Sequence, residues 1–74
     1  MSNATEAIRE KLMAENQDYR RLQEEHSRYA AQLHQLASKT YLNDQEKMEE
    51  VRLKKLKLRA KDQMEELIQA AIPH

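Results

Sequence analysis

The sequence of 74 residues contains no glycine, no cysteine, no tryptophan and no phenylalanine, and its one proline is Pro73. Tight turns and β-hairpins depend on glycine and proline, so this composition argues against all-β and α/β folds. Phosphate-binding loops need glycine where the backbone approaches the phosphate, and they are excluded as well. Without cysteine there is neither a disulfide framework nor a thiolate zinc site. We therefore expect an all-α protein.

An excess of charge of either sign and long apolar runs are also lacking. The chain has 13 Lys and Arg against 13 Asp and Glu, and this balance argues against a generally nucleic-acid-binding surface. No apolar run approaches the roughly 18 residues that span a bilayer, and the first residues lack the apolar core of a signal peptide. We expect a soluble, cytoplasmic protein with no membrane partner.

A heptad pattern runs through the first half of the chain. Apolar side chains recur there at steps of three, four and seven, which is typical of a coiled-coil seam. Most positions between them hold Lys, Arg, Glu and Gln, which favour helix. The pattern predicts one helix over about residues 5–38, with Asn3 and Glu6 spaced to cap its start. The seam consists of Ile8, Leu12, Tyr19, Leu22, His26, Tyr29, Leu33 and Leu36.

A turn over about residues 39–43 should separate this helix from a second one. Asn43 and Glu46 have the spacing of a capping box, and Pro73 cannot continue a helical hydrogen-bond ladder. These signals predict a second helix over about residues 44–71. Its main apolar stripe is Leu53, Leu56, Ala60, Met64, Leu67 and Ala71. A second apolar line lies beside the first and consists of Met48, Val51, Leu58, Ile68 and Ile72.

A short turn makes two helices antiparallel neighbours. The residue numbers of two facing positions then have a nearly constant sum, which is about 82 here. The predicted fold of residues 1–74 is a single coiled-coil-like hairpin of two long antiparallel helices, and one continuous helix stays open as the alternative. The second apolar line would be wet in a monomer, and one seam gives a small core. We expect a four-helix bundle or a larger homo-oligomer. The facing pairs would be Tyr29 with Leu53, His26 with Leu56, and Leu22 with Ala60.

Several motifs of the chain resemble those of a known family. They are Leu22-x-x-Glu25-His26 followed by Tyr29 and Leu33, then Asn43-Asp44, then Leu53-Lys54-Lys55-x-Lys57-Leu58-x-x-Lys61-Asp62. This combination resembles the YdcH-like family of small bacterial proteins of unknown function. The resemblance covers about residues 15–68 and implies a two-helix hairpin in a bacterial cytoplasm, with no established activity. The chain departs from the family pattern at Leu56, where a polar residue is usual, and at Ala60, where a larger aliphatic residue is usual.

His26 is the most suggestive single residue, because a titratable ring on an apolar seam could act as a ligand, an acid or a pH switch. The alternative is structural, since a lone polar seam residue can fix the register of a coiled coil. His34 lies eight positions away, about 80° round the helix, so the two rings do not form a metal pair. No serine has the strained turn and basic partner of a nucleophile. We expect no enzyme, no metal and no cofactor.

Residues 52–61 hold six cations and no anion. Three of them, Lys54, Lys57 and Lys61, share one side of a helix and could contact phosphates. The alternative is that they are neutralised by neighbouring carboxylates on both helices. Those carboxylates belong to Glu24, Glu25, Glu49, Glu50, Glu65 and Glu66.

Two functions follow from these patterns. The first is a protein-interaction or self-association module, for which the interaction residues would be Met48, Val51, Leu58 and Ile68. The second is a nucleic-acid-binding accessory protein that uses the basic stretch 52–61. We favour the first, because net charge is near zero and the three tyrosines do not alternate with the basic residues as base-stacking platforms would.

Overall fold

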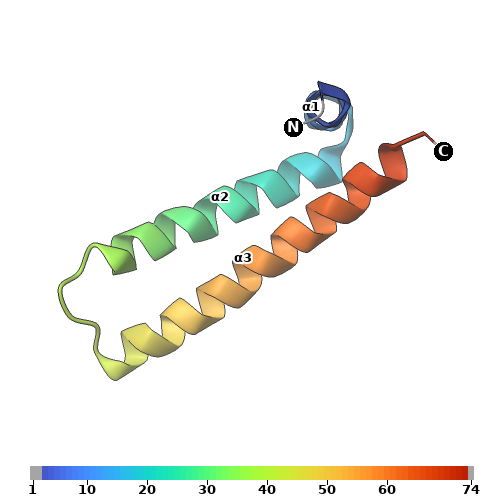
Figure 1. Cartoon of the computed structure of the whole chain (residues 1–74). Helices are drawn as coiled ribbons and strands as arrows, with labels where there is room; N and C mark the ends of the chain where they lie inside the picture. Colours follow the sequence, from blue (N-terminus) through green and yellow to red (C-terminus); the bar gives the residue numbers. More distant parts are fainter. Residues whose placement is uncertain (1–2, 74) are drawn as a thin grey trace.

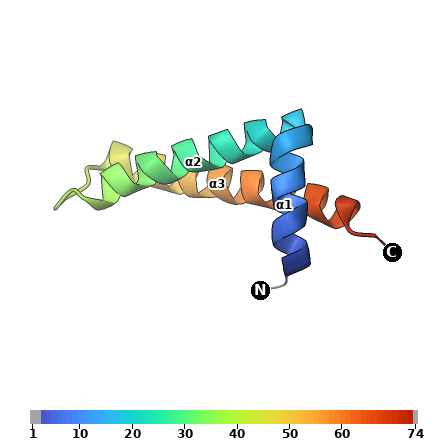
Figure 2. The same ribbon diagram turned by 90° about the horizontal axis from the view of Figure 1, so that it is seen from above.

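The structure, a computed structural model, describes residues 3–73 and is built of helices, with no strand among those residues. Along the chain these are α1 (Asn3–Glu15), α2 (Gln17–Ala37) and α3 (Asp44–Ala71). α2 and α3 lie side by side and run in opposite directions, and α1 crosses their end (Figures 1 and 2). The molecule measures 48 × 19 × 17 Å, so a long helix pair sets its shape.

α3 begins with the capping box that the sequence predicts. The side chain of Asn43 accepts a hydrogen bond from the Glu46 amide at 2.7 Å, and the Glu46 carboxylate accepts one from the Asn43 amide at 3.1 Å. Two amides that have no helical partner are thereby satisfied. At the other end Ile72 is extended, with φ −75° and ψ 126°, as the residue before Pro73 tends to be. The helix therefore has the predicted bounds.

The connection from α2 to α3 is made without glycine. Ser38 ends α2 by donating its amide to the His34 carbonyl at 3.1 Å and its hydroxyl to the Gln35 carbonyl at 2.7 Å. Further on, Lys39 pairs with the Glu46 carboxylate and so ties the connection to the start of α3. No residue of the described chain has a positive φ, so six residues with ordinary backbone geometry make this reversal.

The prediction of one uninterrupted first helix is wrong, because the chain bends at Asn16. This residue is extended, with φ −108° and ψ 110°, and it separates α1 from α2. Figure 2 shows α1 turned away from the line of α2 and laid across α3. The suggested cap by Asn3 involves a side chain outside the described ones.

Hydrogen bonds on both sides of Asn16 account for the bend. Its side-chain oxygen accepts from the Tyr19 amide at 2.9 Å, which makes Asn16 the N-cap of α2. The Asn16 amide still donates to the Leu12 carbonyl at 2.8 Å and completes α1. The Arg20 guanidinium donates to the carbonyls of Met13 and Ala14 at 3.2 and 3.0 Å, so the last turn of α1 is capped as well.

The core lies between the helices and is small. Its buried side chains have exposed fractions of 2–4%, the lowest being that of Leu53. Ile68 is one of them, at 3%, so the prediction that its side chain is exposed to solvent in a single chain is wrong. It lies about 60° round α3 from Leu53, at an edge that would be open beside a straight first helix. The bend brings α1 across this edge. The core consists of Tyr19, Leu22, Leu53, Ala60 and Ile68.

Candidate functional site

Three large apolar side chains of α3 face solvent. Met48 is 74% exposed, Val51 51% and Leu58 59%, so the exposure predicted for these three is confirmed. Each lies about 140–160° round the helix from Leu53, which faces α2. They form an apolar line on the side of α3 opposite the core, and we call Met48, Val51 and Leu58 the outer stripe. Lys55 falls between Val51 and Leu58 on the same side.

The basic stretch on α3 is only partly neutralised. Arg52 binds Glu49 at 2.6 Å and Lys54 lies 3.7 Å from Glu50, both within one turn of α3. The hydrogen bond lowers the pKa of Glu49 and raises that of Arg52. These contacts agree with part of the neutralisation that the sequence suggests.

The carboxylates expected to pair across the helices do not neutralise the basic stretch. Glu25 lies 4.0 Å from Arg21 of its own helix, and Glu65 lies 3.8 Å from Arg9 of α1. Within the described part of the chain, no carboxylate lies at ion-pairing distance from Lys57 or Lys61. The three candidate phosphate-binding lysines therefore differ, because Lys54 is paired and the other two are not.

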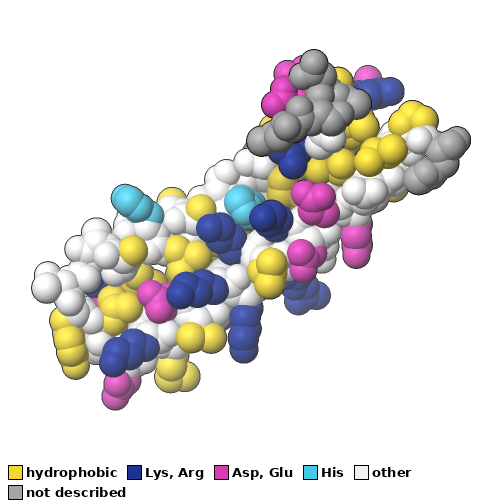
Figure 3. Space-filling model, viewed as in Figure 1, with side chains coloured by type: hydrophobic (Ala, Val, Ile, Leu, Met, Phe, Trp, Pro, Cys, Tyr) yellow, Lys and Arg dark blue, Asp and Glu magenta, His cyan; other side chains and the backbone are white. Residues whose placement is uncertain are grey.

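Lys57 and Lys61 border a groove that all three helices build. It has a volume of about 540 Å³ and is open to solvent on one side. We call it the basic groove. α1 contributes Arg9, which is present only because the chain bends at Asn16. Figure 3 shows basic side chains beside a histidine over this face of the molecule. The remaining lining residues are Tyr19, Gln23, His26, Leu58, Met64, Glu65 and Ile68.

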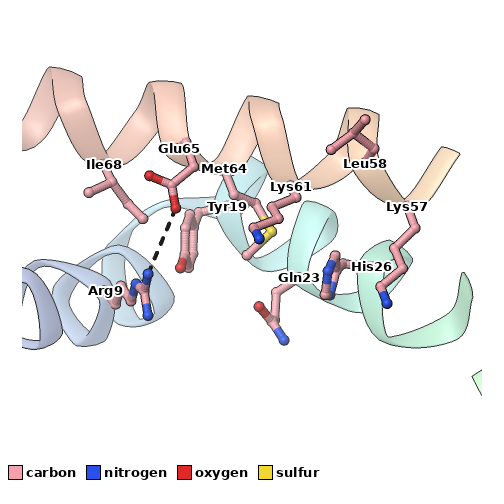
Figure 4. A pocket seen from close by; sticks show the side chains of 10 residues that line it. All are labelled: Arg9, Tyr19, Gln23, His26, Lys57, Leu58, Lys61, Met64, Glu65 and Ile68. Atoms are coloured by element: carbon pink, nitrogen blue, oxygen red, sulfur yellow. Dashed lines mark ion pairs between the residues drawn. The ribbon is translucent and has the colours of Figure 1, made fainter. Parts of the chain in front are cut away.

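The basic groove combines charge with an apolar floor. Three cations and one carboxylate line it, so with His neutral its net charge is +2 in a chain whose net charge is 0. In Figure 4 the side chains of Lys57, His26 and Gln23 point to the same side, and a dashed line joins Arg9 to Glu65. Both partners of that ion pair are nearly half exposed, at 45% and 47%, so water weakens it. The groove thus favours an anion.

His26 is half buried and borders the basic groove with Lys57 and Lys61. The sequence predicts Leu56 as its partner across the helices, whereas its neighbours in the groove include two unpaired lysines. In the described part of the chain, no group of three or more His, Cys, Asp or Glu side chains is placed to hold a metal ion. The structural role and the functional role suggested for His26 both stay predictions.

Sequence reasoning missed Arg9, Tyr19 and Gln23 as residues of one groove. A straight first helix would carry Arg9 away from Gln23, so periodicity alone could not bring them together. A signal for the bend was present nonetheless. Glu15 occupies a core position of the heptad, and Asn16 followed by Asp18 is typical of a helix start.

None of the helices within residues 3–73 has the length and apolar character that a membrane crossing requires. No protein-family model matches the chain, and neither a curated protein nor a solved structure does. The resemblance to the YdcH-like family therefore stays a prediction. Two surfaces of the protein are candidates for a function, the outer stripe and the basic groove.

Proposed function

We propose that this protein is a self-association module in which two copies pair through the outer stripes of their α3 helices. The observation that carries the proposal is the exposure of Met48, Val51 and Leu58 on the side of α3 opposite the core. Apolar side chains aligned at helical spacing mark a surface that another helix can cover.

The small core of one chain supports the same proposal. Five buried hydrophobic residues form it in the part of the chain whose burial the structure describes, and a core of that size rarely supplies more than about 3–5 kcal/mol. Burying a Leu, Val or Met side chain contributes about 1.5–3 kcal/mol when the burial is complete. Covering the outer stripe of both copies would therefore add stability that a single chain lacks.

The spacing of the stripe favours an antiparallel pair. When facing positions sum to about 106, Met48 of one copy meets Leu58 of the other at both ends of the contact, as a and d positions do. Val51 then lies against the aliphatic stem of Lys55, whose ammonium group can reach water. The arrangement has twofold symmetry, so the same residues serve both copies. Each copy would contribute an α2–α3 hairpin, and four long helices would assemble with the two α3 helices innermost.

A charge in the stripe should separate the copies. Val51→Glu is the sharpest variant, because Val51 does not border the basic groove. Gln63→Glu is the matched control, since it places the same charge on an exposed position of α3 outside the stripe. We expect light scattering from about 10 to about 500 micromolar to show a dimer for the wild type and the control, and a monomer for Val51→Glu.

Cysteine cross-linking tests the orientation, and the sequence contains no cysteine that would interfere. Met48→Cys mixed with Leu58→Cys should give a disulfide-linked heterodimer, because antiparallel pairing brings these positions together. Met48→Cys alone should cross-link poorly. A wild type that stays a folded monomer over the whole concentration range would refute self-association. Cross-linking of Met48→Cys to itself would refute the antiparallel arrangement. If the outer stripe binds only a helix of another protein, the module forms a heteromeric complex and not a homodimer.

A further inference from the structure

The basic groove has features that self-association does not use. Its two unpaired lysines come from successive turns of α3, Arg9 comes from α1, and His26 and Gln23 come from α2. Burying unpaired cations against a second copy would cost free energy, so the groove is unsuited to the apolar pairing proposed for the outer stripe. Its volume of about 540 Å³ falls instead within the range of sites for small molecules.

The floor of the groove is as informative as its rim. Tyr19 and Ile68 are core residues, each 3% exposed, and half-buried Met64 and exposed Leu58 line the groove beside them. An apolar floor beside a cationic rim suits a ligand that has both characters. A purely polar anion would leave the floor wet, and a neutral apolar molecule would leave the lysines without partners.

We propose that the basic groove binds a small anionic amphiphile with a single phosphate or carboxylate head. The head lies between the ammonium groups of Lys57 and Lys61, which charge-assisted hydrogen bonds can hold. The alkyl or aromatic body lies along Met64 and the adjoining core side chains. A third cation is available from Arg9, because its ion pair with Glu65 is long and exposed.

A nucleic acid fits these observations less well. A polyanion needs a continuous track of cations, whereas the Glu50 carboxylate lies 3.7 Å from Lys54, the next lysine along this side, and would repel a phosphate there. Glu65 also stands at the groove. The number of free lysines matches one head group better than a chain of phosphates.

The test uses octyl phosphate below its micellar concentration, followed by calorimetry and by NMR of the Met64 and Ile68 methyl groups. Three other probes accompany it: octanoate, inorganic phosphate, and the uncharged octyl glucoside. We expect both anionic amphiphiles to shift the two methyl groups. Inorganic phosphate and octyl glucoside should bind at least about tenfold more weakly, because each lacks one half of the ligand.

Paired variants locate the site. Lys57→Gln with Lys61→Gln should lower the affinity for octyl phosphate at least about tenfold. Lys47→Gln with Arg59→Gln removes two cations of α3 outside the groove. This double variant should change the affinity for octyl phosphate less than about twofold. Val51→Glu should keep or raise the affinity for octyl phosphate, because Leu58 belongs both to the groove and to the outer stripe that a second copy would cover, so the groove and the dimer can fail independently.

Three results would overturn the proposal. Equal binding of octyl glucoside would show a merely apolar surface, and equal loss in both double variants would show a general charge effect. The third is absence of octyl phosphate binding. Tight binding of a mixed-sequence oligonucleotide in its place would have a slope of log affinity against log salt that is smaller by about 2 in Lys57→Gln with Lys61→Gln. That outcome would assign the two lysines to phosphates of a nucleic acid.

Discussion

Replacing Asn16 with alanine should loosen the bend between α1 and α2. In the structure the Asn16 side chain accepts the Tyr19 amide at 2.9 Å, and the residue is extended where a helix would otherwise continue. Alanine cannot cap, and it favours the helical conformation more than any other residue. The substitution therefore destabilises the bent state and stabilises a straight one at the same position.

The size of the effect follows from these two contributions. Losing an asparagine N-cap costs about 1 kcal/mol, and alanine gains up to about 0.7 kcal/mol over asparagine inside a helix. A change of about 1.5 kcal/mol shifts the ratio of bent to straight molecules more than tenfold. The Arg9–Glu65 pair that opposes straightening is exposed and contributes at most about 1 kcal/mol after screening by solvent. We therefore expect a substantial straight population, limited by the packing of α1 on α3.

Backbone chemical shifts and medium-range NOEs measure this population directly. In Asn16→Ala we expect residue 16 to take helical carbon shifts and NOEs to connect positions on either side of the bend. Asn16→Asp is the matched control, because aspartate caps as well as asparagine and should keep the bend. If the two variants give the same shifts at residues 15–17, the N-cap does not determine the bend and the reasoning is refuted.

Three further substitutions test the rest of the structure. The hydrogen bonds from Lys39 and the Asn43 amide lower the pKa of Glu46, so the carboxylate stabilises the fold above its ordinary pKa and this contribution is lost as pH falls through the lowered value. Circular dichroism should show the advantage of wild type over Glu46→Gln shrinking as pH falls below the ordinary carboxyl pKa of 4.5; an advantage that does not shrink on further acidification would contradict the assignment. His26→Leu should keep or raise the melting temperature, because a half-buried polar ring is replaced by an apolar side chain, while a sharp loss of helicity would point to a role beyond packing. Leu53→Ala should cost about 2–5 kcal/mol and remove most of the helix signal in thermal melts, since Leu53 is 2% exposed, and a loss no larger than that of Leu58→Ala at monomeric concentrations would contradict the core assignment.

The start of α3 could be predicted because its signals are local. Asn43 and Glu46 lie three positions apart, and a capping box depends on little beyond that spacing. The end was equally local, because Pro73 restricts the residue before it. Packing of α2 on α3 followed from two stripes of matching period, and Leu22, Leu53 and Ala60 are buried as that match requires.

The bend at Asn16 was missed for a different reason. A heptad pattern continues through a bend as long as both segments turn apolar faces toward the same partner, and Leu12 still lines a cavity with Ala71 as the straight helix would place it. Periodicity therefore cannot distinguish a straight helix from a bent one. The basic groove and the burial of Ile68 both depend on this bend, so neither could be predicted from the pattern.

The capped connection between α2 and α3 has a consequence for how the chain folds. Contacts between these helices join residues whose separation along the chain grows steadily with distance from residues 38–43. Two helices with this arrangement can pack progressively, starting beside their connection, since each new contact closes a loop only slightly longer than the one before. Asn43 and the Lys39–Glu46 pair stand where such closure begins. α1 contacts the far end of α3 across the longest stretch of chain, so we expect it to dock last and to open first in hydrogen exchange.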